Sequence, residues 1–183
     1  MTMQPLTIKI LMFVALWLMA VVLFVLLNRS ADQALSPHGR KWRKARRVRR
    51  KLQGEDMNAA QKLSYLRKID PYVFEELVLM SFREAGYAIT RNRRYSGDGG
   101  VDGRMKKDGV RWFIQCKRYG GYICARHVDE FSAVCERAGV HGVFVHTGKT
   151  GGASKEVSRQ DENITIVSGG RLLWLVVEGK DVL

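Results

Sequence analysis

The order of apolar and polar positions divides the chain into an apolar N-terminal run, a basic stretch and a longer region of short alternating segments. Eighteen consecutive apolar residues occupy 10–27, without a charge, Gly or Pro. A helix of that length would measure about 27 Å, close to a hydrocarbon core of about 30 Å. We therefore expect a transmembrane helix over 8–28. A secretory signal peptide fits less well, because no small-x-small cleavage site follows Leu27.

Basic residues after the apolar run predict its orientation. Lys9 precedes the run. Arg29 follows it, as does the stretch 40–51, in which nine of the twelve residues are Lys or Arg. The positive-inside rule then predicts a single-pass protein of the inner (cytoplasmic) membrane, with its N-terminus outside and the remainder in the cytoplasm. Residues 29–69 are predicted to be a basic cytoplasmic linker that includes a short helix within 55–69.

Helical and strand patterns alternate over 70–183. Asp70 and Pro71 are typical of an N-cap and first helical position, so we expect a helix over 71–85 that ends at Gly86. The remaining segments are predicted, in chain order, as strands at 87–93, 101–107 and 110–118, a helix at 126–138, a strand at 140–147, a helix at 153–161, a strand at 164–168 and a helix at 171–178. Local hairpins followed by β-α-β crossovers favour an α/β fold with a mixed sheet flanked by helices.

Charge is unevenly distributed between these regions. The 183 residues carry a formal net charge of +13, with 31 Lys and Arg against 18 Asp and Glu. Residues 1–70 contain 14 basic and 4 acidic residues (+10), and residues 71–183 contain 17 and 14 (+3). The excess indicates an anionic partner, either nucleic acid or a membrane surface. For the run 40–51 two interpretations stay open: contact with the anionic lipid of a bilayer, or a nonspecific DNA-binding arm.

A predicted hairpin brings chemically active side chains together. Asp108 and Gly109 are a strong two-residue turn signal, so facing residues should have numbers that sum to about 217. Asp102 then lies opposite Gln115, and Lys117 shares a strand face with Gln115. Oxygen ligands with water or phosphate suit Mg²⁺, and a lysine can orient the attacking water or neutralise phosphate charge. Glu75 or Glu76, on the helix at 71–85, could supply a further acid. The spacing alone is equally compatible with an Asp–Lys ion pair on a plain surface hairpin.

Several motifs resemble one known family. They are 74–77 (FEEL), 85–87 (AGY), 96–102 (SGDGGVD) and 115–119 (QCKRY), followed by the strand at Gly142 with Thr147 and Gly148, the helix at Ala153 and 170–173 (GRLL). Together they resemble the Mrr-type (type IV-like) restriction endonucleases of the PD-(D/E)xK nuclease superfamily, over about 70–176. The resemblance implies a nuclease domain over 70–183 with a restriction-endonuclease-like αβββαβ core.

The resemblance also implies site residues and a cofactor. By motif position the catalytic set is Glu75, Asp102, Gln115 and Lys117, with Glu75, Asp102 and Gln115 holding Mg²⁺ for cleavage of DNA phosphodiester bonds. Glu75 rather than Glu76 follows the Phe of the family's F-E pattern, and Gln commonly replaces the second acid in this family. The sequence departs from the family at 168–169 (SG), where an acid is frequent, and in its N-terminal anchor. Weaker candidates for contact with DNA are Asp98, Arg94, Arg118 and Lys149.

Two functions follow from these observations. The first is a membrane-anchored, Mg²⁺-dependent DNA endonuclease of restriction or defence type. The second is a non-catalytic, membrane-tethered DNA-binding module on a nuclease fold, favoured by the basic stretch. A homodimer would suit double-strand cutting, although no residue pattern specifies one.

Overall fold

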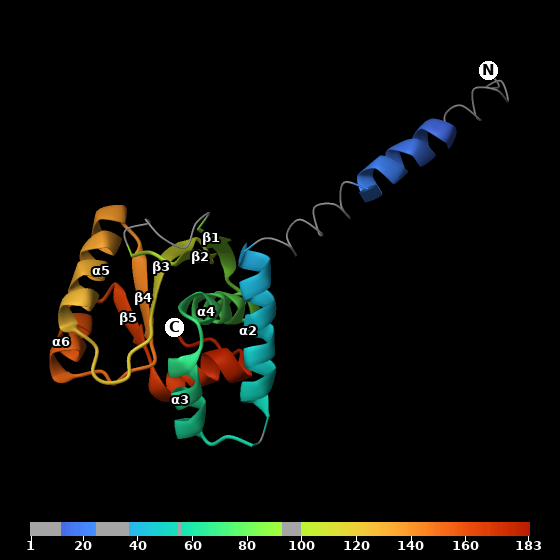
Figure 1. The fold of residues 1–183 in the computed structure, drawn as a ribbon. Coiled ribbons are helices and arrows are strands. Elements are labelled where there is room, and N and C mark those ends of the chain that lie inside the picture. Colours follow the sequence, from blue (N-terminus) through green and yellow to red (C-terminus); the bar gives the residue numbers. More distant parts are fainter. Residues whose placement is uncertain (1–11, 25–36, 55, 93–99) are drawn as a thin grey trace. The chain divides into compact units, whose positions relative to one another are not determined.

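The computed structural model describes residues 12–24, 37–54, 56–92 and 100–183 (Figure 1). The chain divides into two units, one ending at Arg40 and the other comprising Lys41–Leu183. Residues 12–24 form a helix whose side chains are exposed. The larger unit contains the five-stranded sheet and the helices that cover it.

The N-terminal helix corrects one expectation. Within the described ranges, no helix combines the length and the apolar character needed to cross a membrane. Residues 12–24 of the predicted span are helical. The other parts of the predicted span, 8–11 and 25–28, lie outside the described residues. The expected single-pass localisation in the inner membrane is therefore wrong.

The sheet has the order β1-β2-β3-β4-β5 and mixes both pairing directions. β1 (Ala88–Arg91), β2 (Gly103–Lys107) and β3 (Val110–Lys117) pair antiparallel. β4 (His141–His146) and β5 (Ile164–Val167) add to β3 in parallel. This arrangement confirms the predicted mixed sheet, with hairpins first and crossover connections afterwards.

Helices cover both faces of the sheet (Figure 1). One face carries α4 (Pro71–Glu84), α3 (Ala59–Lys68), α7 (Gly169–Leu173) and the π-helix η1 (Trp174–Glu178), around a core that includes Phe74, Leu77 and Ile114. The other face carries α5 (Ala125–Ala138) and α6 (Gly152–Gln160), around Phe131 and Phe144. Burial of large apolar side chains on both faces places the central strands β3 and β4 in the interior.

Helix α4 begins where the sequence predicts. The Asp70 carboxylate accepts a 3.1 Å hydrogen bond from the backbone N–H of Val73, and Pro71 occupies the first turn. The helix ends before Gly86, whose φ of +96° suits a residue without a Cβ. This cap matters for the site, because Glu75 lies in the second turn of α4.

The basic stretch differs from its expected linker conformation. Residues Pro37–Gln53 form helix α2, and its Ala45, Val48 and Leu52 are buried in the same core as α4. Arg49 is also buried and forms an ion pair with Glu84 near the end of α4. The spacing i, i+3, i+7 of the three apolar residues gives α2 a buried face, so residues 41–53 belong to the compact unit. The predicted short helix within 55–69 is present as α3.

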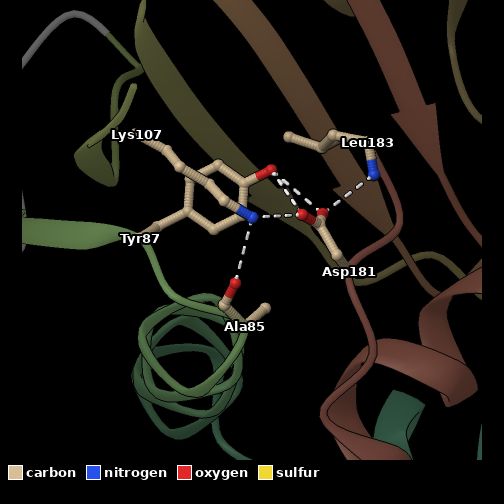
Figure 2. Close-up of polar contacts among 5 residues, drawn as sticks. All are labelled: Ala85, Tyr87, Lys107, Asp181 and Leu183. Carbon is tan, nitrogen blue, oxygen red and sulfur yellow. Dashed lines mark hydrogen bonds and ion pairs between the residues drawn. The ribbon is translucent and has the colours of Figure 1, made fainter. Parts of the chain in front are cut away.

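The C-terminal residues are tied to the edge of the sheet by a small polar cluster (Figure 2). The Tyr87 hydroxyl donates to Asp181 Oδ1 at 2.9 Å, and Lys107 Nζ lies 2.7 Å from Asp181 Oδ2. Lys107 Nζ also donates to the carbonyl oxygen of Ala85 at 3.3 Å. These contacts join the end of α4, strand β2 and the chain terminus.

Candidate active site

The hairpin between β2 and β3 has the predicted register. Asp108 and Gly109 form its turn, with φ of 49° and 84°. Gly103 pairs with Ile114, so facing residue numbers sum to 217. The backbone N–H of Asp102 donates to the carbonyl oxygen of Ile114 at 2.8 Å, which continues the pairing beyond the end of β2. Asp102 therefore lies at the position opposite Gln115.

The Asp102 carboxylate is held by the backbone of β3. Its Oδ2 accepts a 2.7 Å hydrogen bond from the N–H of Cys116. A carboxylate that accepts a backbone N–H is restricted in orientation, since the donor cannot rotate away. The contact keeps this acid beside the segment that carries Gln115 and Lys117.

The carboxamide of Gln115 has one satisfied end and one unsatisfied end. Its Nε2 donates to the carbonyl oxygen of Gly100 at 2.7 Å, which fixes the assignment of the amide. Its Oε1 is buried and has no hydrogen-bond partner among the residues that the structure describes. A buried amide oxygen without a donor is costly, so Oε1 calls for a hydrogen-bond donor or a cation.

Glu75 lies on α4, within electrostatic range of Asp102 and Lys117. Its side chain is half-buried, and its carboxyl has a pKa raised to about 8. Burial is the largest cause, the charges of Asp102, Glu76 and Asp70 add to it, and the charge of Lys117 opposes them. These electrostatic contributions show that Glu75, Asp102 and Lys117 lie within interaction range of one another.

The structure distinguishes Glu75 from its neighbour Glu76. The Glu76 side chain is 1% exposed, and Arg91 Nε donates to its Oε2 at 2.8 Å. Glu76 thus forms an ion pair with strand β1, whereas Glu75 is within electrostatic range of Asp102. The catalytic role of Glu75 stays a prediction.

A hollow of about 550 Å³ opens beside Gln115 and Lys117. Phe113, Gln115 and Lys117 share one side of β3 by strand alternation, and that side faces α5. The hollow is lined by Gly100, Gln115, Lys117, His127, Glu130, Phe131, Ala133, Val134 and Arg137. Gln115 and Lys117 therefore border a space open to a ligand.

The four weaker candidates have different environments. Arg118 Nη1 donates to the carbonyl oxygens of Arg67, at 3.1 Å, and of Ile69, so its guanidinium caps the end of α3. Lys149 is exposed and lies 5.7 Å from the ring centroid of Tyr122. Arg94 and Asp98 lie outside the described residues. Arg118 is thus engaged by the fold itself, contrary to the expectation of a group available to DNA.

The oxygen atoms at the site fit a hard divalent cation. In the described part of the chain, no group of three or more His, Cys, Asp and Glu side chains could hold a metal ion. Glu75 and Asp102 lie within electrostatic range of one another, and the buried Oε1 of Gln115 has no hydrogen-bond partner among the described residues. Mg²⁺ needs few protein ligands, because it keeps several of its waters. A bound cation would reduce the repulsion between Glu75 and Asp102. A cation would also give Oε1 of Gln115 the partner that it lacks among the described residues.

Two backbone groups at the site could not be found from side-chain patterns. The carbonyl oxygen of Gly100 orients the Gln115 amide, and the N–H of Cys116 orients the Asp102 carboxylate. The signal available in the sequence is the pair Gly99 and Gly100 before Asp102, which indicates a backbone that approaches its neighbours closely.

The fold and site together define a nuclease-type α/β domain, and comparison with known families specifies which one. The family model described as "Restriction endonuclease" (Mrr_cat) matches residues 66–176. The chain therefore belongs to this restriction endonuclease family, which confirms the resemblance found in its motifs.

A curated relative is the type IV methyl-directed restriction enzyme EcoKMrr of Escherichia coli (strain K12). The two sequences are 26% identical over 133 residues, which cover 68% of this chain and 44% of the relative. The chain thus spans less than half the length of that enzyme.

Solved structures show weaker likenesses. A protein of unknown function, AF1548, superimposes with a TM-score of 0.42 at 18% identity, over 51% of this chain and 55% of that chain. The restriction endonuclease FokI superimposes with a TM-score of 0.41 at 15% identity, over 75% of this chain and 30% of that chain. Both TM-scores lie below 0.5, so neither likeness bears on function.

Proposed function

We propose that this chain is a Mg²⁺-dependent endonuclease that hydrolyses DNA phosphodiester bonds in a restriction or defence role. The observation that carries the proposal is the buried Oε1 of Gln115, without a hydrogen-bond partner among the described residues, on the strand position opposite Asp102, an acid that repels Glu75. Membership of a restriction endonuclease family supports DNA as the substrate. The Lys117 ammonium beside the same oxygens supplies the cation that phosphoryl chemistry needs.

Glu75, Asp102 and Gln115 would hold the metal through their side-chain oxygens. When bound, the metal would polarise the scissile phosphate and lower the pKa of a coordinated water. The chain's own contribution is preorganisation. The N–H of Cys116 orients the Asp102 carboxylate, and the carbonyl oxygen of Gly100 orients the Gln115 amide by accepting from its Nε2.

Lys117 would act on the phosphate itself. Its ammonium borders the hollow beside Gln115, and it can donate to a non-bridging phosphate oxygen or to the attacking water. As the water oxygen bonds to phosphorus and a P–O bond breaks, negative charge grows on the phosphate oxygens. A fixed ammonium stabilises this charge more in the transition state than in the substrate.

Plasmid cleavage tests the proposal. The purified full chain is incubated with supercoiled plasmid in Mg²⁺ or in EDTA. Both unmodified and methylated plasmids are used, and single-stranded RNA is added as a competing substrate. We include methylated DNA because the relative EcoKMrr is described as methyl-directed. We expect nicked or linear plasmid with Mg²⁺ and none with EDTA. Intact plasmid under all of these conditions would overturn the proposal.

A non-catalytic DNA-binding module is the second candidate, and the basic helix α2 favours it. It predicts the same binding to plasmid in Mg²⁺ and in EDTA, with no strand broken. Binding without cleavage would therefore favour this candidate. A homodimer that cuts both strands stays a prediction, which sedimentation of the DNA complex can check.

A further inference from the structure

Helix α2 has one face composed almost entirely of cations. Residues 37–53 contain nine Lys and Arg and no Asp or Glu. Seven of these cations are exposed, and the six that belong to the compact unit occupy the solvent side of the helix. We call this set the basic face: Arg43, Lys44, Arg46, Arg47, Arg50 and Lys51.

The opposite side of α2 determines which way the basic face points. Ala45 and Leu52 are fully buried, and Val48 is 8% exposed. The Gln53 amide also donates to the carbonyl oxygen of Val177 at 3.0 Å. Because these contacts anchor α2 to the core of the unit, the basic face is rigidly presented to solvent.

Two other cations of α2, outside the basic face, are paired with acids of the compact unit. Arg49, on the buried side, is paired with Glu84, and Lys41 with Asp70. Within the basic face, Arg46 lies 4.9 Å from the ring centroid of Trp42, and Lys51 lies 4.5 Å from that of Tyr65. Like charges three and four residues apart repel one another on a helix. An external polyanion would remove this repulsion.

The position of α2 links the basic face to the candidate active site. At one end of the helix, Lys41 Nζ lies 2.7 Å from Oδ2 of Asp70, the residue that caps α4. Asp70 is close enough to Glu75 to raise the pKa of that carboxyl. The helix therefore starts beside the acidic cluster of the site. It lies outside residues 66–176, which match the family, so it is an addition to the shared nuclease core.

We propose that the basic face of α2 binds the phosphate backbone of double-stranded DNA. The proposal rests on DNA being the substrate of the site. Residues 43–51 extend about 12 Å along the helix axis, and B-DNA carries about seven phosphates over that length. Six cations on a rigid face match this density. Contacts of this kind are independent of base sequence, so they would position DNA without selecting a target.

The test is the salt dependence of DNA binding by the full chain in EDTA, where cleavage cannot occur. The variant Lys44→Gln/Arg47→Gln/Arg50→Gln removes three cations from the basic face. The control Arg111→Gln/Lys155→Gln/Arg159→Gln removes three exposed cations from β3 and α6. The probe is a fluorescent 30-base-pair duplex, measured by anisotropy at several salt concentrations. Each lost phosphate contact reduces the slope of log K against log salt by about 0.9.

We expect the α2 variant to lose about two to three units of slope and at least about tenfold in affinity at 100 mM salt, and the control to lose less than one unit. A charge-conserving variant, Lys44→Arg/Arg47→Lys/Arg50→Lys, should bind as the wild type does. An unchanged slope in the α2 variant would overturn the proposal. The proposal would also be overturned if the control variant or the charge-conserving variant lost as much slope as the α2 variant.

Binding to vesicles that contain anionic phospholipid tests the competing interpretation, in which the basic face binds a lipid surface. If the α2 variant loses vesicle binding but keeps its DNA affinity, the basic face serves a lipid surface and the proposal fails. The plasmid assay separates this proposal from the proposed enzyme function. Cleavage by the wild type with an unchanged salt slope would refute the basic face alone, whereas α2-dependent binding without cleavage would refute the endonuclease alone.

Discussion

Oδ2 of Asp102 lies 2.7 Å from the backbone N of Cys116, which donates a hydrogen bond to it. The acid that is proposed to hold a metal thus also joins the start of β2 to β3. One side chain has two separable roles, an electrostatic role through its charge and a structural role through its oxygen.

Substitution can separate these two roles of Asp102. Asp102→Asn keeps an oxygen that accepts from Cys116 but removes the charge, whereas Asp102→Ala removes both. We expect both variants to lose DNA cleavage. The Ala variant should also lose about 1–2 kcal/mol of unfolding free energy, because a backbone N–H loses a charged acceptor. Thermal and urea unfolding would check this. Equal stability of the two variants would show that the hydrogen bond contributes nothing to the fold.

Glu75 predicts a specific pH dependence of stability in metal-free buffer. The folded pKa of about 8 lies above the usual glutamate value of 4.5. Between these two pH values the folded state therefore binds more protons than the unfolded state. The stabilisation that comes from protonated Glu75 is complete below pH 4.5 and is lost as the pH rises through about 8. Glu75→Gln cannot ionise, so we expect its melting temperature to exceed that of the wild type increasingly from pH 5 to a plateau above pH 8.

The exposed acid Glu162 provides the matched control for this measurement. Glu162→Gln should differ from the wild type by a constant amount over the same pH range. A constant difference for Glu75→Gln as well would contradict the buried, repelled state of Glu75.

Two glycines with the same backbone conformation test the position of Gln115. Gly100 and Gly109 both have a φ of +84°. A Cβ on Gly100 would lie 2.6 Å from Gln115 Nε2, whereas a Cβ on Gly109 would meet nothing within 4 Å. Both Ala variants carry backbone strain of about 1–3 kcal/mol. We expect Gly100→Ala alone to lose most of its cleavage rate, since its Cβ displaces the Gln115 amide. Equal rates in both variants would contradict a role for Gln115.

The polar cluster at the C-terminus predicts acid sensitivity (Figure 2). Burial raises the pKa of the Asp181 carboxyl, but hydrogen bonds from Lys107, Leu183 and Tyr87 outweigh it and leave the pKa below its usual value of 3.8. The ionised Asp181 thus contributes stability above that value, which is lost as the pH falls through the folded pKa. Asp181→Asn should lower stability at pH 7 by no more than about 1 kcal/mol, because the group is partly exposed. The difference should vanish near pH 2 in urea unfolding.

Much of the fold could be predicted because local signals agree with the tertiary structure. The turn at Asp108 and Gly109 set the register that places Asp102 opposite Gln115. The cap at Asp70 and the stop at Gly86 set the bounds of α4. These signals depend on neighbouring residues, which a sequence shows directly.

Other features depend on partners that are distant in the chain. The density of charge in 40–51 indicated a solvated linker, although Ala45, Val48 and Leu52 recur at helical spacing and pack against the core. The hydrogen bonds of Arg118 could not be predicted, because its carbonyl partners, Arg67 and Ile69, lie about fifty residues away. The apolar run at 10–27 predicted a membrane span that the described helix at 12–24 does not support.

The most direct test of the proposed active site compares two lysine variants in single-turnover cleavage of plasmid with Mg²⁺. Lys117 borders the hollow beside Gln115, whereas Lys106 is exposed on β2. Loss of a fixed charge that stabilises the transition state slows cleavage by about 10²–10³-fold. We predict this loss for Lys117→Ala, with a native melting curve, and a wild-type rate for Lys106→Ala. Cleavage by Lys117→Ala at the wild-type rate would contradict the proposed active site.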